Sequence, residues 1–325
     1  MRKLIILLIS ISLFSCNKDE ILPDKIFEGD LTLSTQKSVD IFGSDNYTEI
    51  IGTLHIGGTF LNRSASIRNI DKLASLKAIT HLEIECNDSL INIDGLKNLS
   101  LVENINIEYN PSLVNIGGLR SLPSVYNGSL TLTYNLSLED LKGLSHVEFI
   151  KDLFIIDSPI NNLEGLNKLN TANYIYIHAN SNLTNLRALS NLIEVNSLHI
   201  AFNDSLKSLE GLNKLSAIGD GGFWLRGNNS LISINGLEKL LQNEGNLSIF
   251  ENYKLENLDG ISNLNFVGGN LTVALNYLPL YDTGLNDLCG LQSLLSNEGI
   301  AGRLSIKENL YNPSQQDIID GNCSQ

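Results

Sequence analysis

Acidic and histidine side chains near the start of a repetitive region are the residues whose types could support catalysis or metal binding. Glu83, Glu85 and Glu108 alternate along two neighbouring predicted strands, with His55 and His81 nearby. Paired carboxylates cleave polysaccharides in glycosidases, and oxygen ligands hold divalent cations. We prefer a simpler interpretation, a solvated acidic face. The sequence has no nucleophile elbow, phosphate loop or zinc-ligand spacing, so we assign no catalytic residue, cofactor or metal site.

A second set of side chains is better suited to binding. Four successive repeats place a ring between two apolar strand residues, namely Phe154, Tyr176, His199 and Trp224. Because adjacent strands lie about 4.8 Å apart, these rings are predicted to form one continuous row facing solvent. Neighbouring outward positions extend this row, and we call the nine residues together the aromatic strip: Phe154, Ile156, Tyr174, Tyr176, His178, His199, Trp224, Arg226 and Phe250.

The composition of the aromatic strip is typical of an interaction site. Exposed aromatic patches mark binding surfaces, and Trp, Tyr and Arg are common anchors. The same column holds Asn106 and Thr131 before the strip and Ser248 and Thr272 after it, so the position does not require a ring. Rings also support one another across strands, and a structural role is therefore the alternative. Flat rings suit sugars and a mixed surface suits proteins, so the predicted partner is a protein or a glycan.

The spacing of these residues follows an internal repeat. Corresponding positions from Leu82 to Leu271 are separated by 23, 25, 23, 22, 23, 25, 24 and 24 residues. Each copy opens with the apolar–polar–apolar alternation of a strand, as in Leu198-His199-Ile200. The return segment carries apolar residues at every third position around a glycine, which disfavours a long helix. Turns or short 3₁₀ helices are therefore predicted there.

The repeat Leu-x-x-Leu-x-Leu-x-x-Asn resembles leucine-rich repeats, and the Gly-x-Leu openings at Gly128, Gly245, Gly269 and Gly302 resemble the receptor L-domain. The resemblance covers about residues 50–310. It implies a mainly β fold, a right-handed parallel β-solenoid with one strand per repeat of about 24 residues and short capping helices at both ends. It carries no catalytic residue, and it implies recognition of a protein or a glycan.

An asparagine column follows the strands in most copies. Side-chain amides at stacked turns can satisfy backbone donors and acceptors that the bends leave unpaired. We therefore predict a structural Asn ladder rather than a ligand site. Its predicted members are Asn87, Asn110, Asn135, Asn180, Asn203, Asn228, Asn252, Asn276 and Asn309.

The two ends of such a solenoid need caps, because an exposed leucine ladder would aggregate. Near the N-terminus we predict a strand followed by a short helix from Thr35 to Phe42, which Gly43 ends. Near the C-terminus, Asn312 is predicted to cap a helix that has Pro313 in its first turn.

Two cysteines flank the last predicted strand. In an oxidising compartment, Cys289 and Cys323 are predicted to form a disulfide that fixes the C-terminal cap. Closing a loop of that length is worth about 3–4 kcal/mol in the chain-entropy model.

The first twenty residues predict export and a lipid anchor. A basic pair precedes an apolar run that is too short for a transmembrane helix, which needs about 20 apolar residues, and the layout is that of a cleaved signal. Leu13-Phe14-Ser15-Cys16 resembles the bacterial lipobox, which implies lipidation of Cys16. The following Asn17-Lys18-Asp19-Glu20 resembles the export signal of Bacteroidota surface lipoproteins. It implies an outer-membrane location facing the cell exterior.

Charge narrows the range of partners. The chain has a net charge of −14, and removal of Arg2 and Lys3 with the signal gives −16. This sign argues against nucleic acid and against an anionic membrane face, so the lipid anchor is the expected membrane contact.

The chain is predicted to form one unit, because no Pro/Gly/Ser linker divides it after residue 30. We predict a monomeric, non-enzymatic surface lipoprotein that binds a protein or a glycan. An envelope spacer and a polysaccharide-cleaving solenoid enzyme are the alternatives. The predicted parts are a signal peptide (1–15), a lipidated tether (16–28), an N-terminal cap (29–53), the repeat solenoid (54–280) and the last repeat with the C-terminal cap (281–325).

Overall fold

The computed structural model describes residues 24–59, 66–280 and 283–325. The predicted signal peptide and Cys16 lie outside these described residues. Within the described ranges, fifteen strands form one sheet, and each pairing between these strands is parallel. The mainly β, parallel architecture predicted from the sequence is therefore confirmed.

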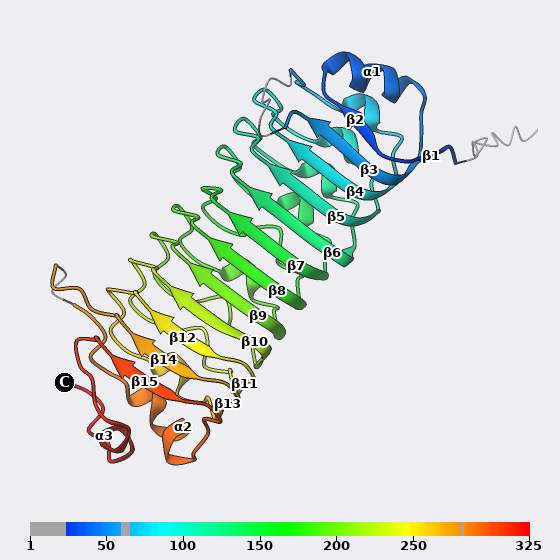
Figure 1. Cartoon of the computed structure of the whole chain (residues 1–325). Coiled ribbons are helices and arrows are strands. Elements are labelled where there is room, and N and C mark those ends of the chain that lie inside the picture. Colours follow the sequence, from blue (N-terminus) through cyan, green and yellow to red (C-terminus); the bar gives the residue numbers. More distant parts are fainter. Residues whose placement is uncertain (1–23, 60–65, 281–282) are drawn as a thin grey trace, which may run out of the picture.

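The strands lie side by side along an elongated molecule, with helices at its two ends (Figure 1). The main path of the sheet comprises β1 (Ile26–Glu28), β3 (Glu49–Gly57), β4 (Ala78–Glu85), β5 (Leu101–Glu108), β6 (Ser124–Thr133), β7 (Phe149–Ile156), β8 (Thr171–His178), β9 (Glu194–Ala201), β10 (Ala217–Arg226), β12 (Leu247–Phe250), β14 (Leu271–Ala274) and β15 (Leu304–Lys307). Three short strands pair beside this path: β2 (Leu31–Leu33), β11 (Gln242–Asn243) and β13 (Phe266–Val267).

The apolar strand residues form a single core behind the sheet. Leu130, Leu153 and Ile175 are paired partners on β6, β7 and β8, and all three are fully buried. Because strand side chains alternate between faces, the residues between the buried positions face away from this core. Burying one such aliphatic side chain stabilises the fold by about 1.5–3 kcal/mol. The core is continuous through the coils that the structure describes.

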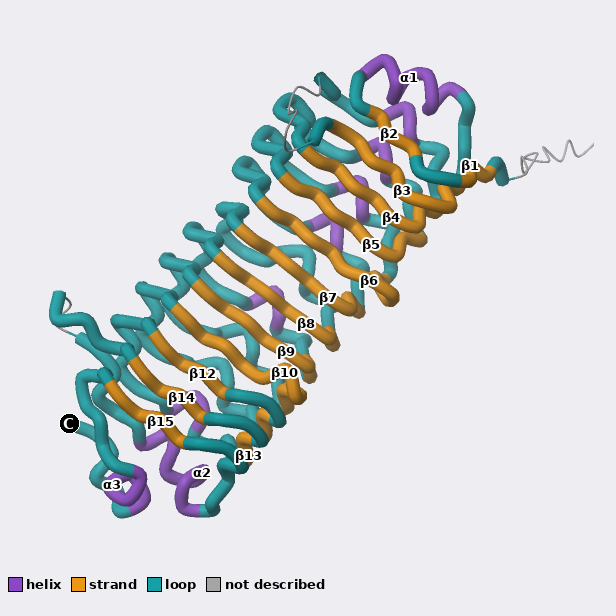
Figure 2. Tube along the Cα trace, viewed as in Figure 1, coloured by secondary structure: helices purple, strands orange, loops and turns teal. Residues whose placement is uncertain are grey.

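The return arcs behind the strands contain turns and short 3₁₀ helices, as the central glycines predict (Figure 2). A β-carbon at Gly95 would collide with the carbonyl oxygen of Ile70 in the neighbouring arc, and one at Gly118 would collide with that of Ile93. Glycine therefore lets successive arcs approach as closely as the strands do. The 3₁₀ helices of the described residues are η1 (Asp71–Leu73), η2 (Asp94–Leu96), η3 (Gly117–Leu119), η4 (Lys142–Leu144), η5 (Arg187–Leu189), η6 (Asp259–Ile261) and η7 (Cys289–Leu291).

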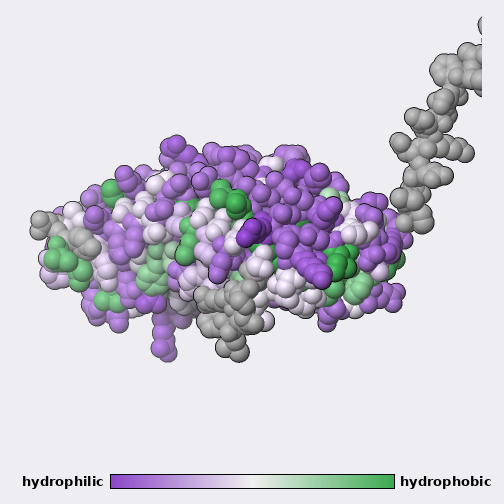
Figure 3. All heavy atoms as spheres, turned by 90° about the horizontal axis from the view of Figure 1, so that it is seen from above, coloured by the Kyte–Doolittle hydropathy of each residue, from purple (hydrophilic) through white to green (hydrophobic). Residues whose placement is uncertain are grey.

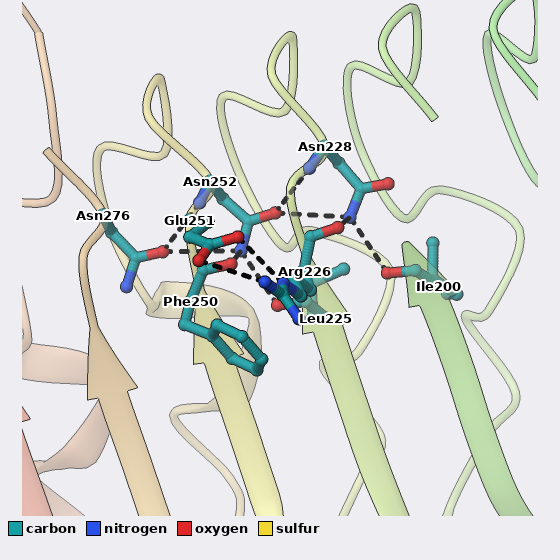
Figure 4. A network of polar contacts seen from close by, with 8 residues as sticks. All are labelled: Ile200, Leu225, Arg226, Asn228, Phe250, Glu251, Asn252 and Asn276. Atoms are coloured by element: carbon teal, nitrogen blue, oxygen red, sulfur yellow. Dashed lines mark hydrogen bonds and ion pairs between the residues drawn. The ribbon is translucent and has the colours of Figure 1, made fainter. Parts of the chain in front are cut away.

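The asparagine column runs through the buried turns that follow the strands. Asn110 is typical, since its Nδ2 donates to the carbonyl oxygens of Ile84 and Glu108 at 2.8 and 2.9 Å. Its Oδ1 accepts from the backbone N–H of Asn87 at 3.2 Å. Each amide thus connects its own turn to the preceding coil. Figure 4 shows the same pattern at Asn228 and Asn252.

Two residues outside the predicted set complete the Asn ladder. In the copy that lacks Asn, the hydroxyl of Ser158 accepts from the backbone N–H of Asn135 at 3.3 Å, and its own backbone N–H donates to Asn180 Oδ1 at 3.2 Å. At the far end, Asn312 Oδ1 accepts from the backbone N–H of Asn309 at 2.9 Å. Asn312 thus terminates the ladder.

The residue before each ladder position adopts a left-handed backbone conformation. This turn follows each strand and precedes the inward-facing amide. Non-glycine residues rarely occupy this region of φ/ψ space, at a cost of about 1 kcal/mol or more each. The residues are Cys86, Tyr109, Tyr134, Asp157, Ala179, Phe202, Gly227, Glu251, Leu275 and Glu308, with φ between 46° and 63°.

The N-terminal cap contains α1 (Gln36–Ser44), which Thr35 caps through a reciprocal capping box with Ser38. The prediction that Gly43 ends this helix is wrong, because Gly43 lies inside it and Asp45 is the C-cap. The glycine has a packing reason instead. A β-carbon at Gly43 would collide with the backbone and side chain of Lys72 in η1, so glycine allows α1 to sit directly on the first arc.

The C-terminal cap contains α2 (Gln292–Ser296) and α3 (Gln315–Ile319). The predicted N-cap Asn312 is also wrong, because Ser314 caps α3 in a capping box with Asp317 and Pro313 precedes the helix. Cys289 and Cys323 form a disulfide between η7 and the segment after α3. Asn312 is unavailable as a helix cap because its amide is bonded to Asn309.

One face of the molecule is largely polar. Hydrophilic residues cover most of the face seen in Figure 3, and hydrophobic residues there form small separate patches. In the described part of the chain, no helix has both the length and the apolar character needed to cross a bilayer.

Candidate binding surface

Strand register brings the aromatic strip together on the outer face of the sheet. Phe154 on β7 pairs with Tyr176 on β8, which pairs with His199 on β9, which in turn pairs with Trp224 on β10. A parallel column two residues further along contains Ile156, His178, Ala201, Arg226 and Phe250. The two columns occupy the centre of the sheet, and the residues at the same two columns on the flanking strands β5, β6 and β14 are small or polar.

The rings of the strip contact one another closely. Tyr174 and Tyr176 are stacked with centroids 6.1 Å apart, and Tyr176 stacks on His178 at 5.3 Å. His199 stacks on Trp224 at 5.6 Å, and Phe154 packs against Tyr174 at 5.4 Å. The ring faces therefore turn mainly toward other rings, and much of what remains accessible is ring edge and polar tip.

The small residue Ser197 creates room for this arrangement. It pairs with Tyr174 on the adjacent strand and is itself buried. The Tyr174 ring reaches across to His199, with centroids 5.0 Å apart. Burial raises the pKa of the Tyr174 phenol above its ordinary value, so the hydroxyl stays protonated at neutral pH and can donate a hydrogen bond.

Arg226 forms the charged end of the strip. Its Nε and Nη2 donate to the Glu251 carboxylate at 2.8 and 3.2 Å, and its guanidinium lies 4.9 Å from the ring centre of Phe250. Figure 4 shows these three side chains together at the ends of β10 and β12. A bidentate pair fixes the guanidinium plane. Arg226 is therefore preorganised, while 43% of its side chain remains exposed.

Phe202 extends the strip at one edge, and the sequence-based set missed it. Its ring packs edge-on against His178 at 5.2 Å and lies beneath the Arg226 guanidinium at 5.2 Å. Gly227 makes room for it, because a β-carbon there would collide with the ring. The available signal was its position directly before a ladder asparagine.

The two histidines of the strip have depressed pKa values. Burial lowers the pKa of His199. Burial is also the main cause of the lowered pKa of His178, and Arg226 adds to it against the opposing effect of Asp157. Both imidazoles are therefore neutral at pH 7. The Nδ1 atom of His178 is buried without a hydrogen-bond partner among the described residues.

The acidic residues considered for catalysis share the same sheet face near the N-terminal end. His55 Nδ1 lies 3.2 Å from Glu83 Oε2, and its Nε2 lies 3.0 Å from the carbonyl oxygen of Gly58. The Nδ2 of Asn106 donates to Glu85 Oε1 at 2.9 Å. Existing neighbours therefore already engage His55 and Glu85.

Burial is the largest cause of raised pKa values for Glu85 and Glu108. Repulsion from Glu83 contributes at Glu85, and repulsion from Glu85 contributes at Glu108. His81 contacts Asn104 at 2.9 Å, on the next strand. In the residues that the structure describes, no three His, Cys, Asp or Glu side chains gather as ligands for a metal ion.

The comparison with known proteins identifies no family for this chain. No protein-family model matches the chain, and no curated protein matches it.

Proposed function

We propose that this protein is a non-catalytic binding module that recognises a macromolecular partner through the aromatic strip. One observation carries the proposal. Among the described strands after β3, only β7, β8, β9 and β10 have a ring at the outward column. The equivalent positions on β5, β6, β12 and β14 are Asn106, Thr131, Ser248 and Thr272. The parallel sheet therefore forms without rings at this column. Their concentration at the centre of the face supports recognition.

The partner is a protein in this proposal, with a glycan as the alternative. A sugar stacks on an open ring face, whereas most faces in the strip contact other rings. Ring edges, the Tyr174 hydroxyl and the Arg226 guanidinium suit a protein surface, where aromatic and arginine anchors dominate binding energy. Among the rings of the strip and its edge, Trp224 and Phe202 are the most exposed, at 36% and 37%.

The sequence resemblance completes the proposal. We infer a right-handed solenoid of the leucine-rich-repeat or receptor L-domain type, with a repeat of about 24 residues, tethered to the outer membrane by a lipid on Cys16 and facing the cell exterior. A Cys16→Ser variant should leave the membrane fraction for the soluble fraction. Unchanged fractionation of that variant would remove the lipobox interpretation.

Site-specific cross-linking in cells tests the binding proposal. A photo-reactive p-benzoylphenylalanine replaces Tyr176 in one variant and Thr272 in a control variant, because both positions belong to the same outward column. We expect a discrete cross-linked product at position 176 and none at position 272. The cross-linked partner is then purified and its affinity for the wild-type chain is measured.

The spacer and enzyme alternatives make different predictions. A spacer would give no product at either position, or the same products at both. An enzyme that used the acidic residues would cleave a polysaccharide and lose that activity in a Glu83→Gln or Glu108→Gln variant. Either result would replace the binding proposal.

A further inference from the structure

A groove at the amino-terminal ends of the central strands is distinct from the aromatic strip. It has a volume of about 430 Å³ and crosses β7, β8, β9, β10 and β11. One row of its lining consists of register partners on these five strands, namely Phe149, Thr171, Glu194, Ala217 and Gln242. At about 4.8 Å per strand, this row spans about 19 Å. The groove is long enough for an extended chain molecule.

One bulged strand, β6, lies next to β7 at one end of this groove, and a second bulged strand, β10, is part of it. On β6, residues 126–128 oppose the single residue Lys151 of β7, and on β10, residues 219–221 oppose the single residue Asn196 of β9. The intervening strands β7, β8 and β9 pair without a register shift. These two insertions are the two 25-residue steps of the repeat. Bulges re-aim strands beside functional sites, and here they flank a stretch of three regular strands.

The polar lining favours a ligand rich in hydroxyl groups. The side chains of Asn196, Gln242 and Glu194 take part in no hydrogen bond or ion pair with another described residue. Amides both donate and accept hydrogen bonds, while carboxylates accept, so neighbouring hydroxyls of one ligand can bind to both types. Ala172 and Val195 add apolar surface at the bottom of the groove.

Charge and aromatic packing narrow the ligand further. The lining contains Glu194 and Glu244 and no basic residue, which disfavours an anionic ligand. At the β7 end, Phe149 lines the groove and stacks on Tyr126 with centroids 5.3 Å apart and planes 21° apart. Tyr126 on β6 does not line the groove itself, but it is 63% exposed, so the ring face that Phe149 does not cover is accessible beside the β7 end of the groove. In contrast to the aromatic strip, this pair presents a ring face on which a sugar can stack.

We propose that this groove binds a neutral oligosaccharide, with the side-chain amides holding its hydroxyls and the Tyr126–Phe149 pair supporting one sugar ring. The site is separate from the proposed protein-binding strip. It therefore stands or fails independently of that proposal.

Calorimetric titration of the full chain with defined sugars tests the site. The probes are maltohexaose, cellohexaose and mannohexaose, with hexagalacturonic acid as the anionic counterpart and hexalysine as a basic peptide. We expect at least one neutral hexasaccharide to bind and hexagalacturonic acid not to bind. The double variant Asn196→Ala/Gln242→Ala and the single variant Tyr126→Ala should each weaken binding at least about tenfold.

A matched double variant removes two exposed amides outside the groove, Asn161→Ala/Asn322→Ala, and should bind as the wild type does. Thermal unfolding verifies that all variants remain folded. Four results would overturn the proposal: no binding of any neutral hexasaccharide at millimolar concentration, binding of hexalysine alone, equal weakening in the matched control, or sugar binding that Trp224→Ala abolishes and the groove variants retain.

Discussion

Replacing one buried amide of the Asn ladder should destabilise the whole parallel sheet. Asn228 is fully buried. Its Nδ2 donates to the carbonyl oxygens of Ile200 and Arg226 at 3.0 and 3.1 Å (Figure 4), and its Oδ1 accepts from the backbone N–H of Asn203 at 3.1 Å. An Asn228→Leu substitution keeps a similar side-chain size and removes both the donor and the acceptor.

The expected magnitude follows from the groups left behind. The backbone N–H of Asn203 and the carbonyl of Ile200 lose these bonds in a buried site, whereas the bond to the Arg226 carbonyl is only part-buried. Each buried polar group left unsatisfied costs about 1–3 kcal/mol. The free energy of unfolding should therefore fall by about 2–6 kcal/mol, which is a large share of the stability of an ordinary domain.

Urea denaturation followed by far-ultraviolet circular dichroism measures this loss. The matched control is Asn98→Leu, because Asn98 is exposed and its amide makes one bond, to the Ala74 carbonyl at 2.8 Å. The control should change stability by less than about 1 kcal/mol. The denaturant slope is compared as well, since partial unfolding of a repeat array lowers it. Equal losses in the two variants would refute the structural role of the ladder.

Three further predictions concern backbone strain, the disulfide and charge. An Ala179→Gly variant should gain about 0.5–1 kcal/mol in the free energy of unfolding, because φ is +56° at that position. Ala201→Gly within β9 should instead lose stability. Urea unfolding measures both changes, and a loss of stability in both variants would contradict the strain argument. Replacing Cys289 and Cys323 by alanine should lower the free energy of unfolding by about 3–4 kcal/mol, because the disulfide closes a loop with a sequence separation of 34. An unchanged urea midpoint would exclude a stabilising role of the disulfide. Burial and nearby carboxylates raise the pKa of Glu108, so ionisation of this side chain lowers stability once the pH rises above the ordinary pKa of a glutamate. A Glu108→Gln variant should therefore have a higher thermal midpoint than the wild type at pH 7, with a smaller difference at pH 4. A larger difference at pH 4 would contradict the raised pKa.

Much of the fold was predictable because its determinants repeat. Every copy presents the same apolar alternation, so an error in one copy is corrected by the others, and residues such as Leu130 and Leu153 are buried as their pattern indicates. The outward column was predictable for the same reason. Once the inward residues are assigned, Tyr176 and Trp224 must face the other side of the sheet.

Single, non-repeated features were harder to predict. Gly43 has the sequence position of a helix terminator, but its reason is contact with Lys72, which only the packing of α1 reveals. Asn312 precedes a helix, yet the open end of the Asn ladder takes its amide, and Ser314 caps the helix instead.

The edge residues of both candidate surfaces depend on local geometry. Phe202 belongs to the strip because a left-handed turn and the adjacent Gly227 direct its ring there. The bulges on β6 and β10 lie beside or within the groove, and the sequence shows them only as longer repeat steps. Neither a turn conformation nor a hollow follows from hydrophobic periodicity.

The affinity of the purified, cross-linked partner for a Tyr176→Ala/Trp224→Ala variant tests the central claim most directly. Anchor residues at interfaces contribute about 2 kcal/mol or more each, so loss of both should raise the dissociation constant about a thousandfold relative to the wild type. The double variant should still unfold cooperatively, because the outward column tolerates Ser248 and Thr272 on neighbouring strands. An unchanged dissociation constant, or loss of the folded state in the variant, would contradict the claim that the aromatic strip is a binding surface.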